Sequence, residues 1–299
     1  MKTILITGGT GLIGKALQEK LASKGYSTTI LTRKKSENSS TFYWNIDKGI
    51  IEKEAVQTAD FIIHLAGAGI ADKRWSKKRK KILINSRIDS TKLLFKKVKK
   101  LNPKLKGFIA TSGVGYYGAT TSEKIYVEND FAANDFLATI CKLWEKESLK
   151  FQNKNIRTVI FRMGVVFSNK GGALKKISTP IKKGYGAIIG SGEQYMPWIH
   201  IDDLCNMFLE AIDNKKLKGI YNAVAPEHTT NKQLSYKIAT ILKKKIWLPP
   251  IPSFILKIIL GRIAMILLKG SQVSSKKIME TGFQFKYVKL NKALKNLLN

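Results

Sequence analysis

The chain has 299 residues, and its 53 lysines and arginines outnumber its 21 aspartates and glutamates, which gives a formal net charge of +32 at pH 7. This length allows a sizeable hydrophobic core, in one large domain or two smaller ones. The two cysteines, Cys141 and Cys205, are too few for a disulfide framework and lack metal-ligand spacing, so we expect no metal site and a reducing, cytoplasmic location. An apolar strand pattern begins at residue 3, so we expect no signal peptide.

The strong basic charge has two interpretations. Its densest runs are 73–81 and 96–100, and a charge of this size makes nucleic acid or a membrane surface a candidate partner. Lysine, however, far outnumbers arginine, and the surplus is spread over the whole chain. Specific nucleic-acid sites depend more on arginine and interleaved aromatic residues. We therefore expect solvated helix faces and no specific nucleic-acid partner, with a nucleic-acid-associated protein as the alternative.

The first predicted elements are a strand, a glycine-rich turn and a helix. This order, which begins with the apolar run Ile4–Ile6, is the context that a dinucleotide-binding fingerprint requires. Gly8 or Gly9 would allow the sharp turn at the strand end, and Gly11 would let the backbone approach a pyrophosphate. Gly14 would let helix and strand pack closely. The alternative is a tight turn without a ligand. The residues predicted to hold phosphates at the helix N-terminus are Gly8, Gly9, Thr10, Gly11, Leu12, Ile13 and Gly14.

The end of the second predicted strand, Thr28–Thr32, indicates which dinucleotide binds. An NAD site usually places an acidic residue there, where it binds the ribose 2′-hydroxyl. This chain has Arg33 and Lys34 instead, and no acid before Glu37. The planar fork of Arg33 suits a 2′-phosphate, and Lys34 adds charge. We therefore expect NADP(H) to be preferred over NAD(H).

Short apolar strands then alternate with longer helical patterns, which predicts an α/β fold: a Rossmann-type, doubly wound parallel sheet with a smaller substrate-side and C-terminal portion. Functional residues are expected at the C-terminal ends of the strands. The dinucleotide-binding domain should span 1–245, with its substrate-side segments mostly after 166. The further predicted strands are 61–65, 107–112 and 158–162, and the predicted helices lie near 12–24, 77–100, 132–153 and 202–213.

Residues 246–299 are predicted to form a small C-terminal domain. The proline-rich segment Ile246–Pro252 should be a stiff, extended connector. It leads into an apolar helix, Ser253–Lys269, interrupted by Lys257 and Arg262. This run is too short and too charged to span a membrane comfortably. We expect an amphipathic helix that packs on the body of the protein, with binding to a membrane surface as the alternative.

Several landmarks together resemble a known family. The motifs Thr7–Gly14, His64–Ala68, Thr111–Gly118 and Trp198–Leu204 occur in that order and resemble the extended short-chain dehydrogenase/reductases, the class of nucleotide-sugar epimerases and dehydratases. The chain is most similar to an atypical branch, the epimerase family proteins, which carry a small C-terminal domain of unknown function. Further marks of that branch are Arg74-Trp75, Ser86-Arg87, Cys141–Glu145 and Gly171–Leu174. The resemblance implies a dinucleotide site, for which further contacts are expected from Leu65, Ala66, Gly67 and Arg162.

The same resemblance shows a departure in the catalytic set. The superfamily uses a Ser or Thr, a Tyr, and a Lys four residues after the Tyr. Aligned on Tyr117-Gly118, this chain has Gly113 at the Ser/Thr position, with Ser112 one residue early. Cys141 and Glu145 occupy the Tyr and Lys positions. A glutamate would raise the pKa of a neighbouring acid, whereas the lysine of the superfamily lowers the pKa of its tyrosine. The resemblance therefore implies a cofactor site but not the catalytic chemistry of the superfamily.

Four residues are candidates for the missing proton chemistry. Glu145 lies four residues after Cys141 on one predicted helix face, so it can act as a general acid/base if that face lines the pocket. Tyr116 and Tyr117 follow a strand end and can donate to a substrate oxygen, with Ser112 as a helper. The alternatives are a surface charge for Glu145, ring packing for the tyrosines and a turn cap for Ser112.

Three residues are candidates for substrate binding. Arg87 replaces the usual Asn of the family and can bind an anion or pair with an acid such as Glu145. Cys141 shares the face of Glu145, which disfavours its thiolate. His200 precedes an acidic pair, although a lone histidine in an apolar run is often a structural hydrogen-bonder.

We expect an NADP(H)-dependent oxidoreductase or epimerase-like enzyme with an unknown small polar substrate; the alternative is a catalytically silent NADP(H)-binding sensor. A homodimer is compatible with this expectation.

Overall fold

The centre of the molecule is an eight-stranded sheet in the computed structural model, which describes residues 1–298. The strand order is β11-β8-β6-β5-β1-β2-β3-β4, and all neighbours run parallel except β3 and β4 at one edge. The order reverses between β1 and β5, which is the switch point where sheets of this kind bind ligands. The strands are β1 (Thr3–Thr7), β2 (Ser27–Thr32), β3 (Thr41–Asn45), β4 (Ile50–Ile51), β5 (Phe61–His64), β6 (Gly107–Gly113), β8 (Thr158–Met163) and β11 (Gly219–Ala223).

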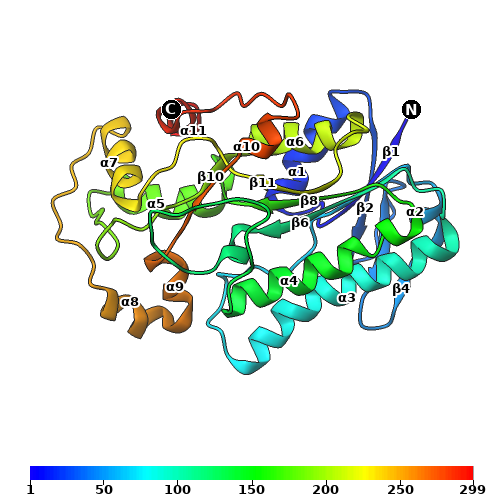
Figure 1. Ribbon diagram of the computed structural model, residues 1–299, viewed down its shortest axis with the longest axis horizontal. Coiled ribbons are helices and arrows are strands. Elements are labelled where there is room, and N and C mark those ends of the chain that lie inside the picture. Colours follow the sequence, from blue (N-terminus) through cyan, green and yellow to red (C-terminus); the bar gives the residue numbers. More distant parts are fainter. Residues whose placement is uncertain (299) are drawn as a thin grey trace.

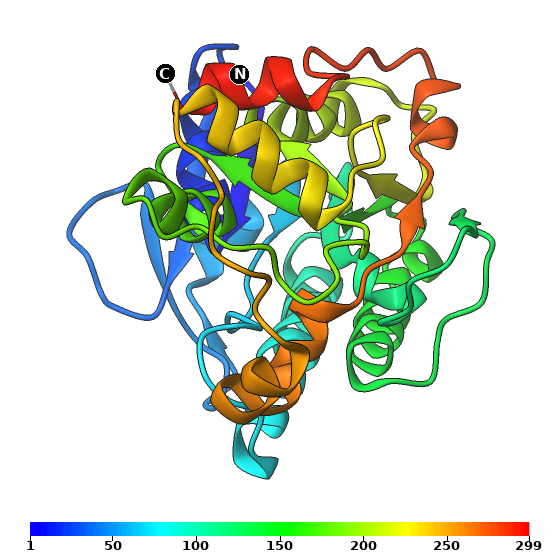
Figure 2. The same ribbon diagram turned by 90° about the vertical axis from the view of Figure 1, so that its left-hand side faces the viewer.

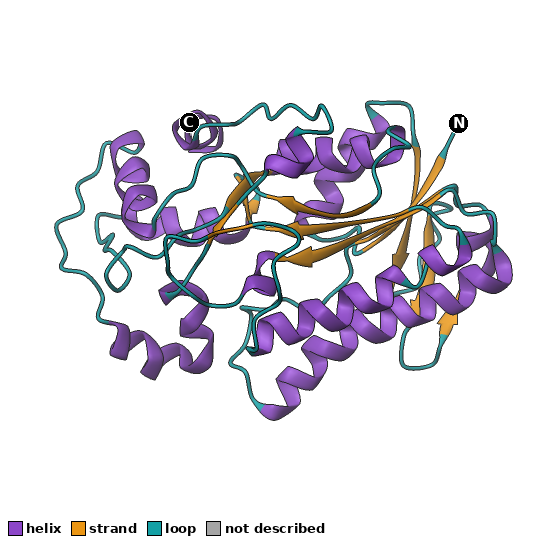
Figure 3. Ribbon diagram, in the orientation of Figure 1, coloured by secondary structure: helices purple, strands orange, loops and turns teal. Residues whose placement is uncertain are grey.

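Helices cover both faces of the sheet, so it forms the middle of three layers (Figure 1, Figure 3). α1 packs against α6 on one face, and α3 packs against α4 on the other. In β1, Ile4 and Ile6 belong to the core on the α1 side, and Leu5 belongs to the core on the α3 side. Strands buried on both faces read as continuous apolar runs. The helices of these layers are α1 (Leu12–Ala22), α2 (Lys53–Gln57), α3 (Lys77–Leu101), α4 (Phe136–Leu149) and α6 (Ile201–Asp213).

A smaller region with its own hydrophobic cluster is built around α5 and α7. Trp198 and Leu234 lie in this cluster together with Leu290 and Leu294 of the last helix, α11, which runs beside α7 (Figure 2). The remaining elements are η1 (Val114–Tyr117), β7 (Ile125–Tyr126), η2 (Gln152–Lys154), β9 (Val165–Ser168), α5 (Gly172–Lys182), β10 (Trp198–His200), α7 (Asn231–Ile241), α8 (Ser253–Leu260), η3 (Gly261–Ile263), α9 (Ala264–Leu268), β12 (Gln272–Val273), α10 (Lys276–Met279) and α11 (Leu290–Leu298).

The C-terminal residues share their cores with the rest of the chain. Ile278 and Phe283 belong to the cluster under α1 and α6, and α11 belongs to the cluster of α5 and α7. Residues 278–297 are thus packed onto the body. The division of the chain into 1–245 and 246–299 stays a prediction.

The predicted apolar helix over 253–269 is wrong in its continuity. Gly261, with φ of +61°, ends α8, and a 3₁₀ turn leads into α9. The expected packing on the body is also only partial. Leu256 and Ile263 are buried, but Phe254 is 61% exposed and Ile258 is 71% exposed. No helix within residues 1–298 is long and apolar enough to cross a membrane.

The predicted α/β fold with a Rossmann-type parallel sheet is confirmed. The strands predicted at 28–32, 61–65, 107–112 and 158–162 agree with β2, β5, β6 and β8 to within one residue at each end. The helix predicted over 132–153 begins later, at Phe136, because the Asp135 side chain accepts a hydrogen bond from the Ala138 N–H and caps it.

Candidate functional site

The glycine turn between β1 and α1 is tight on one side and open on the other. Gly8 has φ of +72°, and its carbonyl accepts a hydrogen bond of 3.0 Å from the Gly11 N–H. A Cβ on Gly14 would overlap the Gly8 carbonyl oxygen, so only glycine lets α1 approach the turn. A Cβ on Gly11 would meet only that oxygen, at 3.3 Å. The exposed side of Gly11 therefore has room for a ligand.

The first turn of α1 offers free N–H groups. Gly11 is the N-cap, and within residues 1–298 no side chain caps this helix. The first N–H groups of a helix lack intrahelical partners and bind anions well. The neighbouring strand β2 pairs with β1 through Thr7 and Leu31, and it is followed by the exposed residues Arg33 and Lys34. Two cations thus follow the strand next to the glycine turn.

The end of β5 forms the other wall of the switch point, and a buried histidine supports it. The Thr7 hydroxyl lies 2.7 Å from His64 Nδ1 and accepts a hydrogen bond from the Ala66 N–H. His64 Nε2 lies 3.0 Å from the Thr91 hydroxyl on α3. Burial, and then the charge of Arg87, lower the pKa of His64 to about 3, so the ring is neutral. This support was not predicted from the sequence, although Thr7 and His64 are polar residues at the ends of the apolar runs of β1 and β5.

Ser112, Glu145 and Arg162 meet in a buried cluster from β6, α4 and β8. The Ser112 hydroxyl donates to Glu145 Oε1 at 2.7 Å. Arg162 donates to both carboxylate oxygens, from Nε to Oε1 and from Nη2 to Oε2, each at 2.9 Å. Burial opposes the charge on Arg162, but the hydrogen bonds and charge of Glu145 raise its pKa above the ordinary value. The pair is a bidentate, buried ion pair.

This cluster bears on two predictions: that Arg87 could pair with Glu145, and that Arg162 contacts the cofactor. Arg162, not Arg87, is the partner of Glu145. The third guanidinium nitrogen of Arg162, Nη1, donates to the Tyr117 hydroxyl and the Glu128 carbonyl. All three nitrogens therefore donate to protein acceptors, and the geometry gives no support to the predicted contact of Arg162 with the cofactor.

The two candidate tyrosines lie in different surroundings. The Tyr117 hydroxyl donates to Asn222 Oδ1 at 2.7 Å and accepts from Arg162. Burial raises the pKa of Tyr117 to about 12. Tyr116 is half-buried, with the Arg162 guanidinium carbon 3.4 Å from its ring centroid. Within residues 1–298, the Tyr116 hydroxyl has no hydrogen-bond partner, so it is the tyrosine with a free polar end.

Cys141 and His200 are both held by protein partners. The Cys141 thiol donates to the Gly113 carbonyl at 3.5 Å, and burial raises its pKa to about 11, with the Glu145 charge acting in the same direction. The His200 ring stacks on Tyr287 at 3.7 Å. Its Nδ1 accepts from the Asp202 N–H, and its Nε2 lies 3.1 Å from Asn296 Oδ1. These contacts fit the structural interpretation of His200, which ties β10 to the C-terminal residues.

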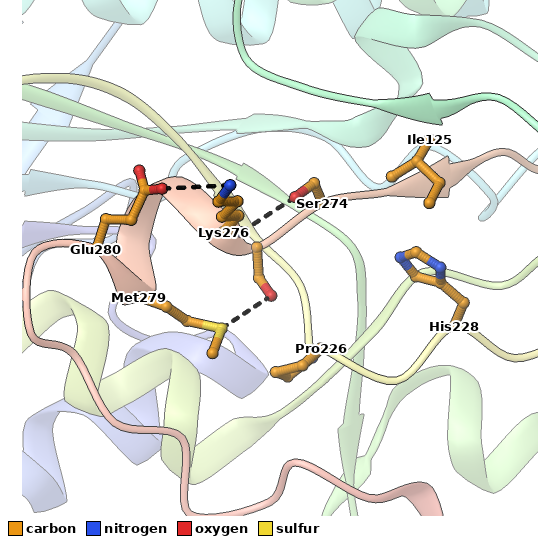
Figure 4. A pocket seen from close by; sticks show the side chains of 8 residues that line it. Ile125, Pro226, His228, Ser274, Lys276, Met279 and Glu280 are labelled. Atoms are coloured by element: carbon orange, nitrogen blue, oxygen red, sulfur yellow. Dashed lines mark hydrogen bonds and ion pairs between the residues drawn. The ribbon is translucent and has the colours of Figure 1, made fainter.

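A cavity of about 490 Å³ lies elsewhere, beside β12 and α10 (Figure 4). None of the residues predicted for cofactor, catalysis or substrate lines it. One link to the candidate site is the Asn222 side chain, which donates to the Ser274 carbonyl. The candidate site is therefore placed at the switch point and not in this cavity. The cavity is lined by Ile125, Pro226, His228, Ser274, Ser275, Lys276, Met279 and Glu280.

Comparison with known proteins gives a family for this geometry. Residues 4–223 match the NAD dependent epimerase/dehydratase family, and residues 251–297 match a domain of unknown function, DUF1731. The chloroplastic epimerase family protein SDR39U1 homolog of Arabidopsis thaliana is 34% identical over 99% of this chain and 86% of its own length. The epimerase family protein YfhF of Bacillus subtilis is 35% identical over 99% of this chain and 97% of its own length.

A solved structure agrees with these matches. The crystal structure of human epimerase family protein SDR39U1 with NADPH has a TM-score of 0.90 at 30% identity, and the match covers 99% of this chain and 98% of the human chain. The glycine turn, the switch point and these matches lead to one conclusion: the chain belongs to the NAD-dependent epimerase/dehydratase family, with a C-terminal segment of the DUF1731 type.

Proposed function

We propose that this protein is an NADP(H)-dependent oxidoreductase or epimerase-like enzyme. The observation that carries the proposal is the junction of β1, α1 and β2. There, an open glycine turn and uncapped helix N–H groups lie next to the exposed cations Arg33 and Lys34. A human relative that crystallised with NADPH supports the same cofactor. Gly8–Gly14 would hold the pyrophosphate, and Arg33 and Lys34 would contact the 2′-phosphate.

The nicotinamide ring, when bound, supplies hydride transfer. The chain must then supply a proton donor or acceptor. We assign this role to Glu145 acting with Ser112, whose hydroxyl already donates to the Glu145 carboxylate. Tyr116 is the second candidate because its hydroxyl has no partner in the described part of the chain. Tyr117 is less favoured because its hydroxyl is engaged by Asn222 and Arg162. Leu65, Ala66 and Gly67 would line the opposite wall, next to Gly8.

A second candidate function is an NADP(H)-binding sensor without turnover. The bidentate ion pair favours it, because Arg162 engages both oxygens of Glu145, and no Tyr-Lys pair occupies positions 141 and 145. The enzyme proposal is tested by fluorescence titration of NADPH followed by turnover against broad panels of carbonyl compounds and sugar nucleotides. Net NADPH oxidation with a carbonyl compound, or epimerisation of a sugar nucleotide without net NADPH oxidation, supports the enzyme. Tight NADPH binding without turnover across both panels supports the sensor, and the absence of NADPH binding contradicts both.

Three other expectations stay predictions: a cytoplasmic location, a homodimer and the lack of a specific nucleic-acid partner. For the last, loose binding of random RNA should weaken by orders of magnitude between about 50 and 200 mM salt, as counterion release requires.

A further inference from the structure

Arg87 is a buried cation that has no counter-charge among residues 1–298. It lies on α3 and is only 8% exposed. Its Nη1 donates to the Leu83 carbonyl at 3.0 Å, and its guanidinium carbon lies 5.1 Å from the Trp144 ring centroid. Among residues 1–298, no carboxylate lies within 4.0 Å of Arg87, and neither its Nε nor its Nη2 has an acceptor. Burial lowers the pKa of Arg87 to about 10, which reflects the cost of keeping an unpaired charge out of water.

A second arginine lies on the same side of the helix. Arg79 precedes Arg87 by eight residues, and this spacing brings two side chains onto one face of an α-helix. Arg79 Nη2 donates to the Gly69 carbonyl at 2.6 Å, whereas its buried Nε has no acceptor within residues 1–298. Its one acidic neighbour is Asp72, an exposed side chain 3.9 Å away. The charge of Arg79 also contributes to the lowered pKa of Arg87.

Both arginines lie against the loop that follows β5. A Cβ on Gly67 would be 2.9 Å from the Arg87 guanidinium carbon, so the glycine leaves room for the cation. This loop forms one wall of the switch point, because Leu65 and Ala66 lie against Gly8 of the cofactor turn. The other titratable neighbours of Arg87 do not neutralise it: His64 is neutral, and burial raises the pKa of Cys141.

We propose that Arg87, with Arg79 beside it, forms a binding subsite for an anionic group, a phosphate or a carboxylate, at the β5 wall of the switch point. A guanidinium fork with two free donors matches either anion. The inference rests on the proposed function only for the source of the anion. The anionic group belongs either to the substrate, which is then an anionic compound, or to the dinucleotide, as its pyrophosphate. Two arms of one experiment distinguish these sources.

The experiment measures inorganic phosphate binding by thermal shift at constant ionic strength. It compares the wild type with Arg87→Met, Arg87→Lys and the control Lys92→Met, which removes an exposed charge from the same helix. We expect phosphate affinity to fall about tenfold to a hundredfold in Arg87→Met, the scale of a charged hydrogen bond. Arg87→Lys should lie in between, because it keeps the charge but loses the fork. Lys92→Met should match the wild type.

The melting temperature without phosphate provides an independent readout. Removal of an unpaired buried charge should leave it unchanged or raise it. If Arg87→Met and Arg87→Lys both bind phosphate like the wild type, the subsite does not exist. If Arg87→Met melts lower while the phosphate shift persists, Arg87 is a structural cation on Trp144 and the proposal is overturned. If Arg87→Met does not fold, wild-type phosphate affinity in Arg87→Lys and in Arg79→Gln contradicts the subsite.

Repeating the titration with saturating NADPH identifies the source of the anion. If the Arg87-dependent phosphate shift persists, the subsite takes an anionic substrate. If NADPH abolishes that shift and Arg87→Met also weakens NADPH binding, the subsite takes the cofactor pyrophosphate. A wild type that binds phosphate through Arg87 but does not bind NADPH would contradict the proposed function and leave the anion subsite supported.

Discussion

The glycine turn and the Ser112–Glu145–Arg162 cluster both lie at C-terminal ends of strands in one sheet. They differ in whether their polar groups have hydrogen-bond partners within the protein. At the turn, the first N–H groups of α1 and the charges of Arg33 and Lys34 have no partners among residues 1–298. In the cluster, the serine, the carboxylate and the guanidinium satisfy one another. Free polar groups point to a ligand, whereas satisfied ones stabilise the protein and can react only when their hydrogen bonds rearrange. The proposed cofactor half of the site is therefore open, and the proposed catalytic half is closed.

The first prediction, with the largest expected change, tests whether Glu145 acts as a general acid/base although it is ion-paired with Arg162. If Glu145 is the general acid/base, Glu145→Gln should lower turnover by about 10²–10⁴-fold, the usual contribution of such a group. NADPH affinity should change little. Steady-state kinetics on the first panel substrate that turns over provides the measurement, with Tyr116→Phe and Tyr117→Phe as parallel variants. Unchanged turnover in all three variants would show that the catalytic residues are misassigned.

The second prediction tests the ion pair as a source of stability. Arg162→Met would leave the Glu145 carboxylate buried without a cation, so we expect a loss of about 3–5 kcal/mol in the free energy of unfolding, measured by urea denaturation. As the control, Lys170→Met removes the partner of Glu19 in an ion pair that is exposed on both sides and should cost at most about 1 kcal/mol. The double variant Arg162→Met/Glu145→Gln should recover part of the loss. Equal costs for the two single variants would contradict the buried pair.

The third prediction separates the two sides of the glycine turn. Gly14→Ala places a Cβ against the Gly8 carbonyl, so it should destabilise the fold by about 1–3 kcal/mol, as overpacking does. Gly11→Val projects into the open side, so it should weaken NADP binding by roughly tenfold or more with the fold largely kept. Calorimetry and thermal denaturation of both variants measure the contrast. Wild-type NADP affinity in Gly11→Val would mean that the turn does not hold the phosphates.

The fourth prediction concerns the pH dependence that His64 adds to the β5 wall. Its pKa is about 3 in the folded protein and about 6.5 in an unfolded chain. Below pH 6.5 the unfolded state therefore binds a proton that the folded state does not, and stability falls as pH drops. The slope from this group is up to about 1.4 kcal/mol per pH unit between those pKa values. Urea denaturation from pH 7 to 4.5 should show a smaller slope in His64→Gln; an identical slope would place the titration elsewhere.

The parts of the molecule that follow local rules were predictable from the sequence. The strands β5, β6 and β8 contain the short apolar runs 61–63, 108–110 and 159–161, and Gly8, Gly11 and Gly14 have the spacing of a phosphate-binding turn. β11 was not predicted, since it is a short strand that contains the polar, buried Asn222.

Contacts between distant residues were not predictable in the same way. Glu145 and Arg162 are 17 residues apart and come from different elements, so sequence spacing could not pair them. The break at Gly261 depends on a positive φ that composition alone does not reveal. The choice of Arg162 over Arg87 as the partner of Glu145 is likewise a property of the packed sheet.

We propose that Arg33 makes the site at the glycine turn selective for NADP. Isothermal titration calorimetry of NADP and NAD against the wild type and Arg33→Ala measures this selectivity. We expect the wild type to prefer NADP, and Arg33→Ala to weaken NADP binding by about 1.5–3 kcal/mol, the scale of a charged hydrogen bond, while NAD binding stays nearly unchanged. Equal affinity of the wild type for NAD and NADP, or an Arg33→Ala variant that binds NADP like the wild type, would contradict the account.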